Sequence, residues 1–314
     1  MSLGHKMSFW EYLPAYELSR KPRIIAAFDT DFLRNLEAFR RSIPSDNAWT
    51  LLLQTGWSVQ EPQFAAELKN GLAEAHRLFP ETRIIVLVNE KEALSILGES
   101  AECVWCHQNA FLDPARYPLA DKERSFDAIY VARITPFKRH ALAALVPNLY
   151  LIGSYSQCEK AYFQEVMQTV PHAAWAEKVN SWRIGRQMGR ACCGLALSAV
   201  EGAMFVCGEY SLCGLPVVST SNIGGRDAML PEFAVFHASD TPESVAAGVE
   251  HWKANPVPPQ EIREEFLRLA AVHRACLEDL LASIAGRRLA LPHKLGIRCR
   301  LWPHQKFLHG IRKK

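Results

Sequence analysis

Apolar positions in the first 120 residues form short continuous runs that alternate with amphipathic segments. Apolar runs of about four to eight residues, rich in β-branched side chains, are typical of buried strands, whereas apolar residues repeated every three to four positions are typical of helices. Strands are expected at 23–28, 49–54, 82–89 and 102–106, and helices at 32–41, 63–78 and 92–97. Strands that alternate with helices predict a parallel sheet covered on both faces, which is an α/β fold.

The same alternation begins again after an irregular segment at 107–119 and a charged stretch at 121–124. We therefore place a domain boundary at 121/122. Strands are expected at 126–132, 148–153, 195–198, 216–219 and 235–238, and helices at 162–170, 179–192, 209–213, from 240 onwards, and at 259–285. The prediction is an N-terminal domain at 1–121, a C-terminal domain at 122–286 and a tail at 287–314.

The composition is that of a folded protein, with 49% apolar and 22% charged residues among 314. This length suits two domains of ordinary size. No apolar run reaches the ~18 residues that a membrane-spanning helix needs, so none is expected. Nine cysteines without framework spacing indicate reduced thiols in a cytoplasmic protein. Cys103 to His107 matches a haem-attachment pattern, but a core strand is the favoured interpretation because haem attachment requires export.

The net charge of +3 arises from the tail. Residues 287–314 carry nine Lys or Arg and no acidic residue, which leaves a net charge of −6 on the rest of the chain. The tail also contains Trp302 and several leucines. Three alternatives stay open: it packs across the domains, it contacts an anionic membrane or a lipid-linked acceptor, or it is solvated. Nucleic acid is not an expected partner. The expected location is the cytoplasm, with peripheral contact at the inner face of the membrane as one alternative.

Two glutamates mark the segment 199–229 as a candidate site. Glu201 and Glu209 are separated by seven residues, and on a helix this spacing of a little over two turns would place both carboxylates on one face. A strand pattern at 215–220 follows, and then Gly224 and Gly225. Glycines after a strand let backbone N–H groups approach a phosphate or sugar closely. The segment therefore predicts a site for a polar, phosphorylated ligand.

This ordered set of residues resembles the donor-binding half of the family 4 glycosyltransferases. The pattern consists of Glu201, Glu209, Gly214-Leu215-Pro216-Val217-Val218 and Gly224-Gly225. The resemblance implies the GT-B fold, which has two Rossmann-like parallel-sheet domains facing a cleft, and here the first domain is reduced. The resemblance is firm over about 126–285, extends more weakly over 20–125 and is absent from the tail.

Arg133 and Lys138 directly follow the strand expected at 126–132, at the end where open α/β sheets bind ligands. Fixed cations suit a diphosphate, and this pair resembles the Arg and Lys that hold the donor diphosphate in the family. The alternative is a pair of solvated surface cations. The resemblance implies that Glu209 accepts hydrogen bonds from the ribose hydroxyls, because a carboxylate has two acceptor oxygens. It also implies that Glu201 faces the transferred sugar, which makes Glu201 the catalytic candidate.

Backbone groups complete the expected donor site. N–H groups near Phe205 and Val206 would lie between the glutamates, where the start of a helix could meet the diphosphate. Gly224 and Gly225 form either a plain turn or a loop close to the sugar or phosphate. His107 and Asn109 lie at the end of the first domain, near the expected cleft, and are candidates for contact with acceptor or donor.

The resemblance implies a metal-independent hexosyltransferase of polysaccharide biosynthesis that retains anomeric configuration. Its donor would be a UDP-, GDP- or ADP-sugar, its acceptor a hydroxyl of a glycan or lipid-linked molecule, and it would need no cofactor and no metal. No protein nucleophile or base is assigned. Two alternatives remain: a non-catalytic GT-B binding or scaffold protein, and another GT-B enzyme such as a nucleotide-sugar epimerase or a phosphorylase.

Several positions depart from the family pattern. The first strand is followed by Phe28 to Phe32 without a glycine, where the family has a glycine-rich loop. Arg139 stands where a glycine is usual, Tyr210 where an alanine is usual, and Arg226-Asp227 where a glutamate is common. The first domain is also short and is predicted to contain only four strands, so its acceptor site must be reduced or built differently.

Overall fold

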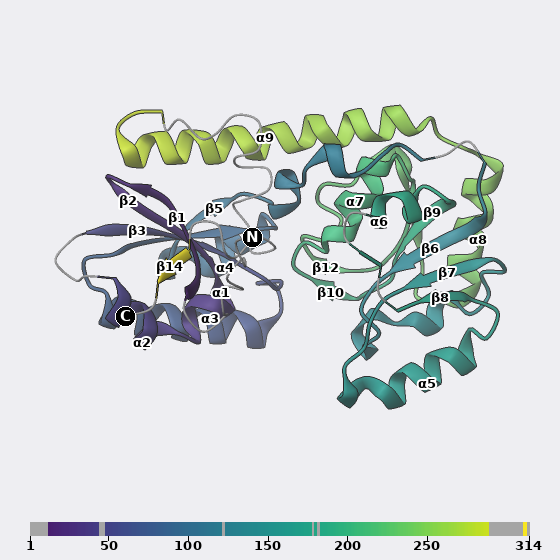
Figure 1. Cartoon of the computed structure of the whole chain (residues 1–314), viewed down its shortest axis with the longest axis horizontal. Helices are drawn as coiled ribbons and strands as arrows, with labels where there is room; N and C mark the ends of the chain where they lie inside the picture. The colour runs from purple at the N-terminus through teal and green to yellow at the C-terminus, as the bar shows by residue number, and fades with distance from the viewer. Residues whose placement is uncertain are drawn as a thin grey trace, which may run out of the picture. The chain divides into compact units, whose positions relative to one another are not determined.

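The computed structural model describes residues 12–43, 48–120, 123–177, 179–180, 183–288 and 310–312. The chain forms two compact units (Figure 1). Unit 1 draws on residues 1–111 and 273–314, and unit 2 on residues 112–272. The chain therefore leaves unit 1 at Phe111 and returns to it at His273. The boundaries predicted from the sequence lie later in the chain, at 121/122 and 286/287.

Unit 1 is built on a six-stranded sheet in the order β14-β1-β2-β3-β4-β5. The strands are β1 (Tyr12–Arg20), β2 (Arg23–Phe28), β3 (Trp49–Gln54), β4 (Arg83–Val88), β5 (Glu102–Trp105) and β14 (Gly310–Arg312). β2 to β5 pair in parallel, whereas β1 is antiparallel to both β2 and β14. The four predicted parallel strands are therefore confirmed. The apolar runs of β3 and β4 are buried almost throughout, as expected for strands covered on both faces.

Four helices belong to the first part of unit 1. They are α1 (Asp29–Leu33), α2 (Leu36–Ser42), α3 (Pro62–Leu78) and α4 (Glu92–Leu97). The helix predicted at 32–41 is thus two short helices, and the break falls at Asn35, whose side-chain amide donates to the Asp31 carbonyl oxygen at 2.8 Å. The rings of Phe32 and Phe39 pack edge to face with centroids 4.9 Å apart and join the two pieces to one core.

The prediction of only four strands in the first domain is wrong, because β1 and β14 extend this sheet by two antiparallel strands. β1 contains Pro14, which cannot donate to a strand partner, and its register with β14 shifts between Tyr12 and Tyr16. In Figure 1, β14 lies beside β1 although some 290 positions separate them in the chain. Part of the basic tail therefore completes the sheet of unit 1. Residues 289–309 and 313–314 lie outside the described residues, as does the proposed contact of the tail with a membrane.

Unit 2 contains a second six-stranded sheet, in the order β13-β11-β9-β6-β7-β8, with every pair parallel. The strands are β6 (Phe126–Val131), β7 (Leu149–Ile152), β8 (Ala174–Ala176), β9 (Ala191–Ala196), β11 (Val217–Thr220) and β13 (Val235–Ala238). The helices are α5 (Lys160–Thr169), α6 (Ile184–Met188), α7 (Phe205–Cys213) and α8 (Pro242–Ala254), and the long α9 (Pro259–Ala285) contributes residues to both units. A further two-stranded parallel sheet joins β10 (Val200–Glu201) to β12 (Ile223–Gly224).

Two predictions for unit 2 need correction: the helix at 179–192 and the strand at 195–198, which is β9 and spans Ala191–Ala196. The helix expected at 179–192 is wrong, since α6 covers only Ile184–Met188, ends at Gly189 and is followed directly by β9. The small, apolar sequence of β9 fits a buried strand and a buried helix equally well, so its pattern alone did not locate the change. β8, β10 and β12 are two or three residues long and were not predicted. Among the described residues, the helices are all too short or too polar to cross a bilayer.

Candidate functional site

The strand order of unit 2 reverses between β6 and β9. In open α/β sheets, ligands bind beyond the carboxyl ends of the strands at such a reversal. Arg133 and Lys138 follow the carboxyl end of β6, and Glu201 follows that of β9. The sheet thus carries three of the predicted site residues to the edge where a ligand is expected.

Lys138 and Glu201 form an ion pair between Nζ and Oε1. Their side chains are only 11% and 9% exposed, so the pair is withdrawn from water. The hydroxyl of Tyr130 donates to the Lys138 carbonyl oxygen and fixes the loop that carries the lysine. Removing one member of a buried pair leaves an uncompensated charge. An anion that binds Lys138 must therefore share the ammonium group with Glu201 or replace it.

Glu201 lies on β10, not on a helix. β10 pairs in parallel with β12, and this pairing places Glu201 opposite Gly224. Gly224 has φ 107°, a conformation that side-chain-bearing residues rarely adopt. The expectation that Glu201 and Glu209 share one helical face is therefore wrong, although Glu201 and the glycine pair are brought together.

Helix α7 begins at Phe205, four residues after Glu201. Met204 precedes it in the left-handed region with φ 43°, and the Met204 side chain makes no capping hydrogen bond. Phe205 and Val206 form the first turn, where the helix dipole favours an anion. Glu209 is the fifth residue of α7, so the prediction that it opens the helix is wrong.

The carboxylate of Glu209 is bound within unit 2. Its Oε1 accepts a hydrogen bond of 2.7 Å from the Tyr117 hydroxyl. Burial raises the pKa of Glu209 above its usual range, although the Tyr117 hydrogen bond acts in the opposite direction. Tyr117 was not predicted from the sequence, because it lies 92 positions away in the chain.

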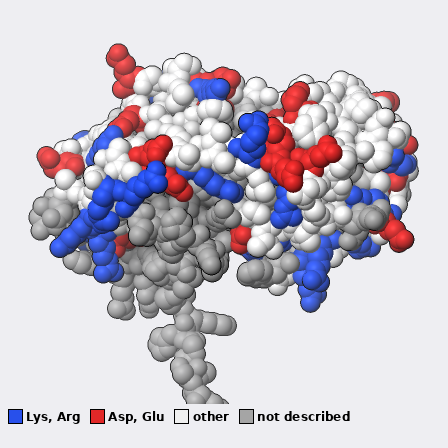
Figure 2. All heavy atoms as spheres, turned by 90° about the horizontal axis from the view of Figure 1, so that it is seen from above, with Lys and Arg blue, Asp and Glu red and all other residues white. Residues whose placement is uncertain are grey.

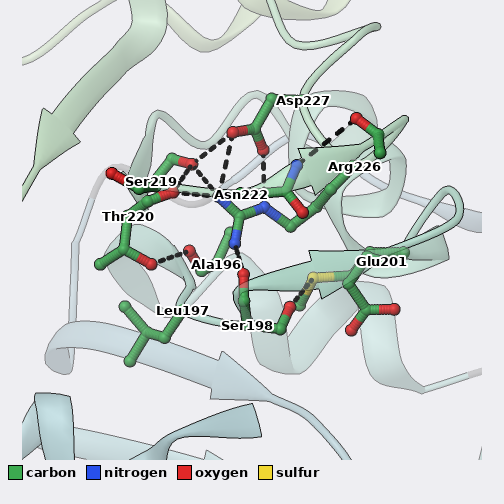
Figure 3. A network of polar contacts seen from close by, with 12 residues as sticks. Ala196, Leu197, Ser198, Glu201, Ser219, Thr220, Asn222, Arg226 and Asp227 are labelled. Carbon is green, nitrogen blue, oxygen red and sulfur yellow. Dashed lines mark hydrogen bonds and ion pairs between the residues drawn. The ribbon is translucent and has the colours of Figure 1, made fainter. Parts of the chain in front are cut away.

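Arg226 is the largest fully buried side chain in the described part of the chain. Its guanidinium donates to the carbonyl oxygens of Ser198 and Thr220, to Ser219 Oγ at 2.6 Å and to the Asp227 carboxylate at 2.8 Å (Figure 3). These acceptors lie after β9, at the end of β11 and after β12. Arg226 thus ties together the loops that carry Glu201 and the glycine pair.

Arg139 also bonds to residues at the ends of β9 and β11. Its guanidinium donates to the Leu197 carbonyl oxygen, to Thr220 Oγ1 at 2.7 Å and to Asp240 Oδ2 at 2.8 Å. Its backbone has φ 52°, in the left-handed region that favours glycine. The side-chain hydrogen bonds of Arg139 offset the local strain of this backbone conformation.

Tyr210 fills space that a glycine leaves open. A Cβ added to Gly194 on β9 would lie 2.4 Å from Tyr210 Cδ2. The Tyr210 hydroxyl accepts from the Val131 amide at 2.9 Å and donates to the Ile129 carbonyl oxygen at 3.2 Å, at the end of β6. The departure from alanine at this position therefore fixes α7 against the strand that leads to Arg133 and Lys138.

His107 and Asn109 lie in unit 1, after β5. Both side chains are buried. The backbone N–H of Asn109 donates to His107 Nδ1 at 3.1 Å, and the backbone N–H of His107 donates to His273 Nδ1 at 3.3 Å. These bonds hold the loop to α9. The roles of His107 and Asn109 toward a ligand stay predictions.

Buried polar side chains lie at or after the carboxyl ends of the parallel strands of unit 1. They are Asp29, Gln54, Asn89, Glu90 and Gln108. The amide of Gln54 donates to Asn89 Oδ1 at 3.2 Å, and Glu90 Oε1 accepts from the Val59 amide at 2.6 Å. Sequence reasoning did not single out these residues, although a polar residue directly after an apolar strand was an available signal.

The expectation of no metal assumed that the chain lacks an Asp-Xaa-Asp pair, which is wrong, because Asp29 and Asp31 form one. Asp29 Oδ1 accepts from the amides of Thr30 and Gly56, at 2.7 and 3.3 Å. Across the described ranges, no three His, Cys, Asp or Glu side chains gather in a way that could hold a metal ion. On the face drawn in Figure 2, basic and acidic side chains of the described residues are interspersed.

The chain is similar to several solved structures of low sequence identity. The structure of Anabaena HepE in complex with UDP has a TM-score of 0.62 and 13% identity, with 83% of this chain and 78% of HepE covered. Sucrose-phosphate synthase from Thermosynechococcus elongatus has a TM-score of 0.57 and 15% identity, with 84% of this chain and 72% of the synthase covered. TarM has a TM-score of 0.57 and 11% identity, with 81% of this chain and 57% of TarM covered. The fold is GT-B.

No protein-family model matches the chain, and no curated protein matches it at a significant level. At 11–15% identity the likeness to the three structures concerns the fold alone. The predicted GT-B class is thus confirmed, and the assignment to family 4 stays a prediction.

Proposed function

We propose that this chain is a glycosyltransferase that moves a sugar from a nucleoside-diphosphate sugar to a hydroxyl of a glycan or lipid-linked acceptor. The observation that carries the proposal is the buried Lys138–Glu201 pair, opposite Gly224, at the strand reversal of a GT-B sheet. Cations and the first turn of a helix suit a diphosphate. HepE has been solved with UDP and with UDP-glucose, which supports a UDP-sugar as the first donor to try.

The roles of the residues follow from their chemistry. Arg133 and Lys138 bind the diphosphate and stabilise the charge that develops on it as the sugar departs. The first turn of α7, at Phe205 and Val206, and the loop at 224–225 supply backbone N–H groups. Glu209 accepts hydrogen bonds from the ribose hydroxyls while Tyr117 holds its Oε1. Glu201 faces the transferred sugar.

The acceptor hydroxyl forms its bond to the anomeric carbon on the face from which the diphosphate leaves and gives its proton to the departing diphosphate, so that configuration is retained. Arg133 and Lys138 act mainly by electrostatic stabilisation, because the negative charge on the leaving diphosphate grows as its bond to the sugar breaks. We assign no protein nucleophile and no base.

Binding of UDP, GDP and ADP by the full chain tests the donor site. Calorimetry is expected to give a Kd for at least one of the three, and Glu209→Ala to weaken it at least about tenfold, equivalent to about 1.4 kcal/mol. Lys138→Ala alone would leave the buried Glu201 carboxylate without its cation, which would destabilise the fold as well as the site. The double variant Lys138→Gln/Glu201→Gln therefore tests the cation, since it replaces the ion pair by two neutral side chains of similar shape.

The matched control is Lys253→Ala, which removes an ion pair with Asp127 on the same unit away from the candidate site. This variant is expected to bind nucleotide as the unchanged chain does. Turnover with the corresponding nucleotide sugar and a glycan acceptor then tests transfer. If no nucleoside diphosphate binds at millimolar concentration, the proposed function is wrong.

A further inference from the structure

Arg133 is exposed but is not a freely moving side chain. Its side chain is 62% exposed, whereas that of its partner Glu159 is only 9% exposed. Nε and Nη2 of Arg133 both donate to Oε1 of Glu159, at 3.0 and 2.5 Å. Two of the five N–H groups of the guanidinium are therefore directed to a buried carboxylate, and three remain for other partners.

Glu159 is itself held on its other oxygen. Its Oε2 accepts from the Ser156 amide at 2.8 Å and from Ser156 Oγ at 2.5 Å. Ser156 and Glu159 form a capping box on the turn at Gln157–Glu159 that leads into α5. The hydrogen bonds from Arg133, and then those from Ser156, lower the pKa of Glu159 to about 2, so the carboxylate is ionised at any pH used for activity.

Two physical effects oppose each other at this position. An anion beside Arg133 reduces the net positive charge that a diphosphate would meet, which weakens binding. A guanidinium that is already oriented loses less side-chain freedom when a ligand binds, which strengthens it. Both oxygens of the Glu159 carboxylate already accept hydrogen bonds, so the carboxylate need not become more ordered when a ligand binds Arg133. The second effect, tighter binding, is therefore expected to be the larger one.

We propose that Glu159 is a positioning residue that holds the guanidinium of Arg133 ready for the diphosphate of the donor. The inference rests on the proposed function. It differs from that function in naming a residue that touches no ligand and acts through Arg133 alone. Glu159 lies 26 positions after Arg133, and neither the site pattern nor the family resemblance pointed to it.

The test is the affinity of the full chain for UDP, or for whichever of the three nucleoside diphosphates the unchanged chain binds. Glu159→Ala is expected to raise Kd about tenfold, and Arg133→Ala to raise it at least as much. The double variant Arg133→Ala/Glu159→Ala is expected to bind no more weakly than Arg133→Ala, since Glu159 acts only through that arginine. Glu159→Gln keeps an acceptor for Arg133 and is expected to recover part of the loss.

Ser156→Ala is the control for the helix cap, because it removes the hydroxyl bond and leaves the contact between Arg133 and Glu159 in place. It is expected to change Kd less than threefold. A Ser156→Ala loss as large as that of Glu159→Ala would overturn the inference, because the effect would then come from the cap. Unchanged or tighter binding by Glu159→Ala, with Arg133→Ala impaired, would also overturn it while leaving the proposed function intact. Absence of binding by the unchanged chain would instead overturn the proposed function.

Discussion

Asp29 offers a quantitative test of the buried polar side chains of unit 1. The residue is 1% exposed, and burial raises the pKa of its carboxyl group from 3.8 to about 6, with hydrogen bonds from Thr30 and Gly56 acting in the opposite direction. The neighbouring charges are Asp31, which raises this pKa, and Arg34, which lowers it. Asp29 Oδ1 accepts both amide bonds, whereas Oδ2 has no partner within the described chain.

The shift of about two pKa units corresponds to about 3 kcal/mol. Because the folded state binds the proton more tightly than the unfolded chain, this contribution to stability is complete below pH 3.8 and is lost as the pH rises through about 6. Asp29→Asn keeps an acceptor at Oδ1 and carries no charge at any pH. The unfolding free energy of the variant minus that of the unchanged chain is therefore expected to rise by about 2–3 kcal/mol between pH 4 and pH 7.

Urea unfolding followed by tryptophan fluorescence measures this difference at a series of pH values, and effects common to both proteins cancel in it. Glu67→Gln is the control, since it removes a negative charge from an exposed position on α3 of the same unit. A constant offset between Asp29→Asn and the unchanged chain over this range would refute the reasoning, because it would mean that Asp29 titrates alike in both states.

Two further predictions concern packing in unit 2. Gly194→Ala is expected to destabilise the chain by about 1–3 kcal/mol, because the new methyl group meets the Tyr210 ring; Gly194→Ala/Tyr210→Ala should lose less than the sum of its single variants in chemical unfolding. Arg226→Met is expected to lower the free energy of unfolding by about 3–5 kcal/mol, because the Asp227 carboxylate and the carbonyl oxygens of Ser198 and Thr220 lose their bonds to the guanidinium. A melting temperature of Arg226→Met within a degree of the unchanged chain would show that water satisfies these groups.

Most of the parallel strands were predictable from the sequence, because burial on both faces leaves a continuous apolar run. β2, β3 and β13 were predicted with their observed ends, and β4, β5, β6, β7 and β11 within one residue at each end. The strands that were missed lack such runs. β1 is an antiparallel strand interrupted by Pro14, and β8, β10 and β12 are too short to show a period. β14 lies in the tail, whose mixture of basic and apolar residues was interpreted as packing across the domains, contact with a membrane, or exposure to solvent, and not as a strand.

The positions of the candidate residues in the fold were partly predictable, and their contacts were not. The sequence placed Arg133 and Lys138 after a strand, which the structure confirms, whereas their roles toward a ligand stay predictions. Their partners within the chain were not found, because contacts between distant segments leave no local pattern. Arg139 shows the difference. The sequence marked it only as a departure from a glycine. Its backbone φ of 52° and its side-chain bonds to Leu197, Thr220 and Asp240 became known only from the structure.

The two predicted diphosphate cations are held in opposite ways. Arg133 is exposed, and its partner Glu159 is fully bonded to Ser156, so a ligand can bind the arginine while this pair stays intact. Lys138 is buried and paired with Glu201, itself a candidate for contact with the sugar, so a ligand at the lysine changes the environment of that carboxylate. Under the proposed function, an anion at Lys138 shares the ammonium group with Glu201 or replaces that carboxylate, so binding of the diphosphate is coupled to the environment of Glu201.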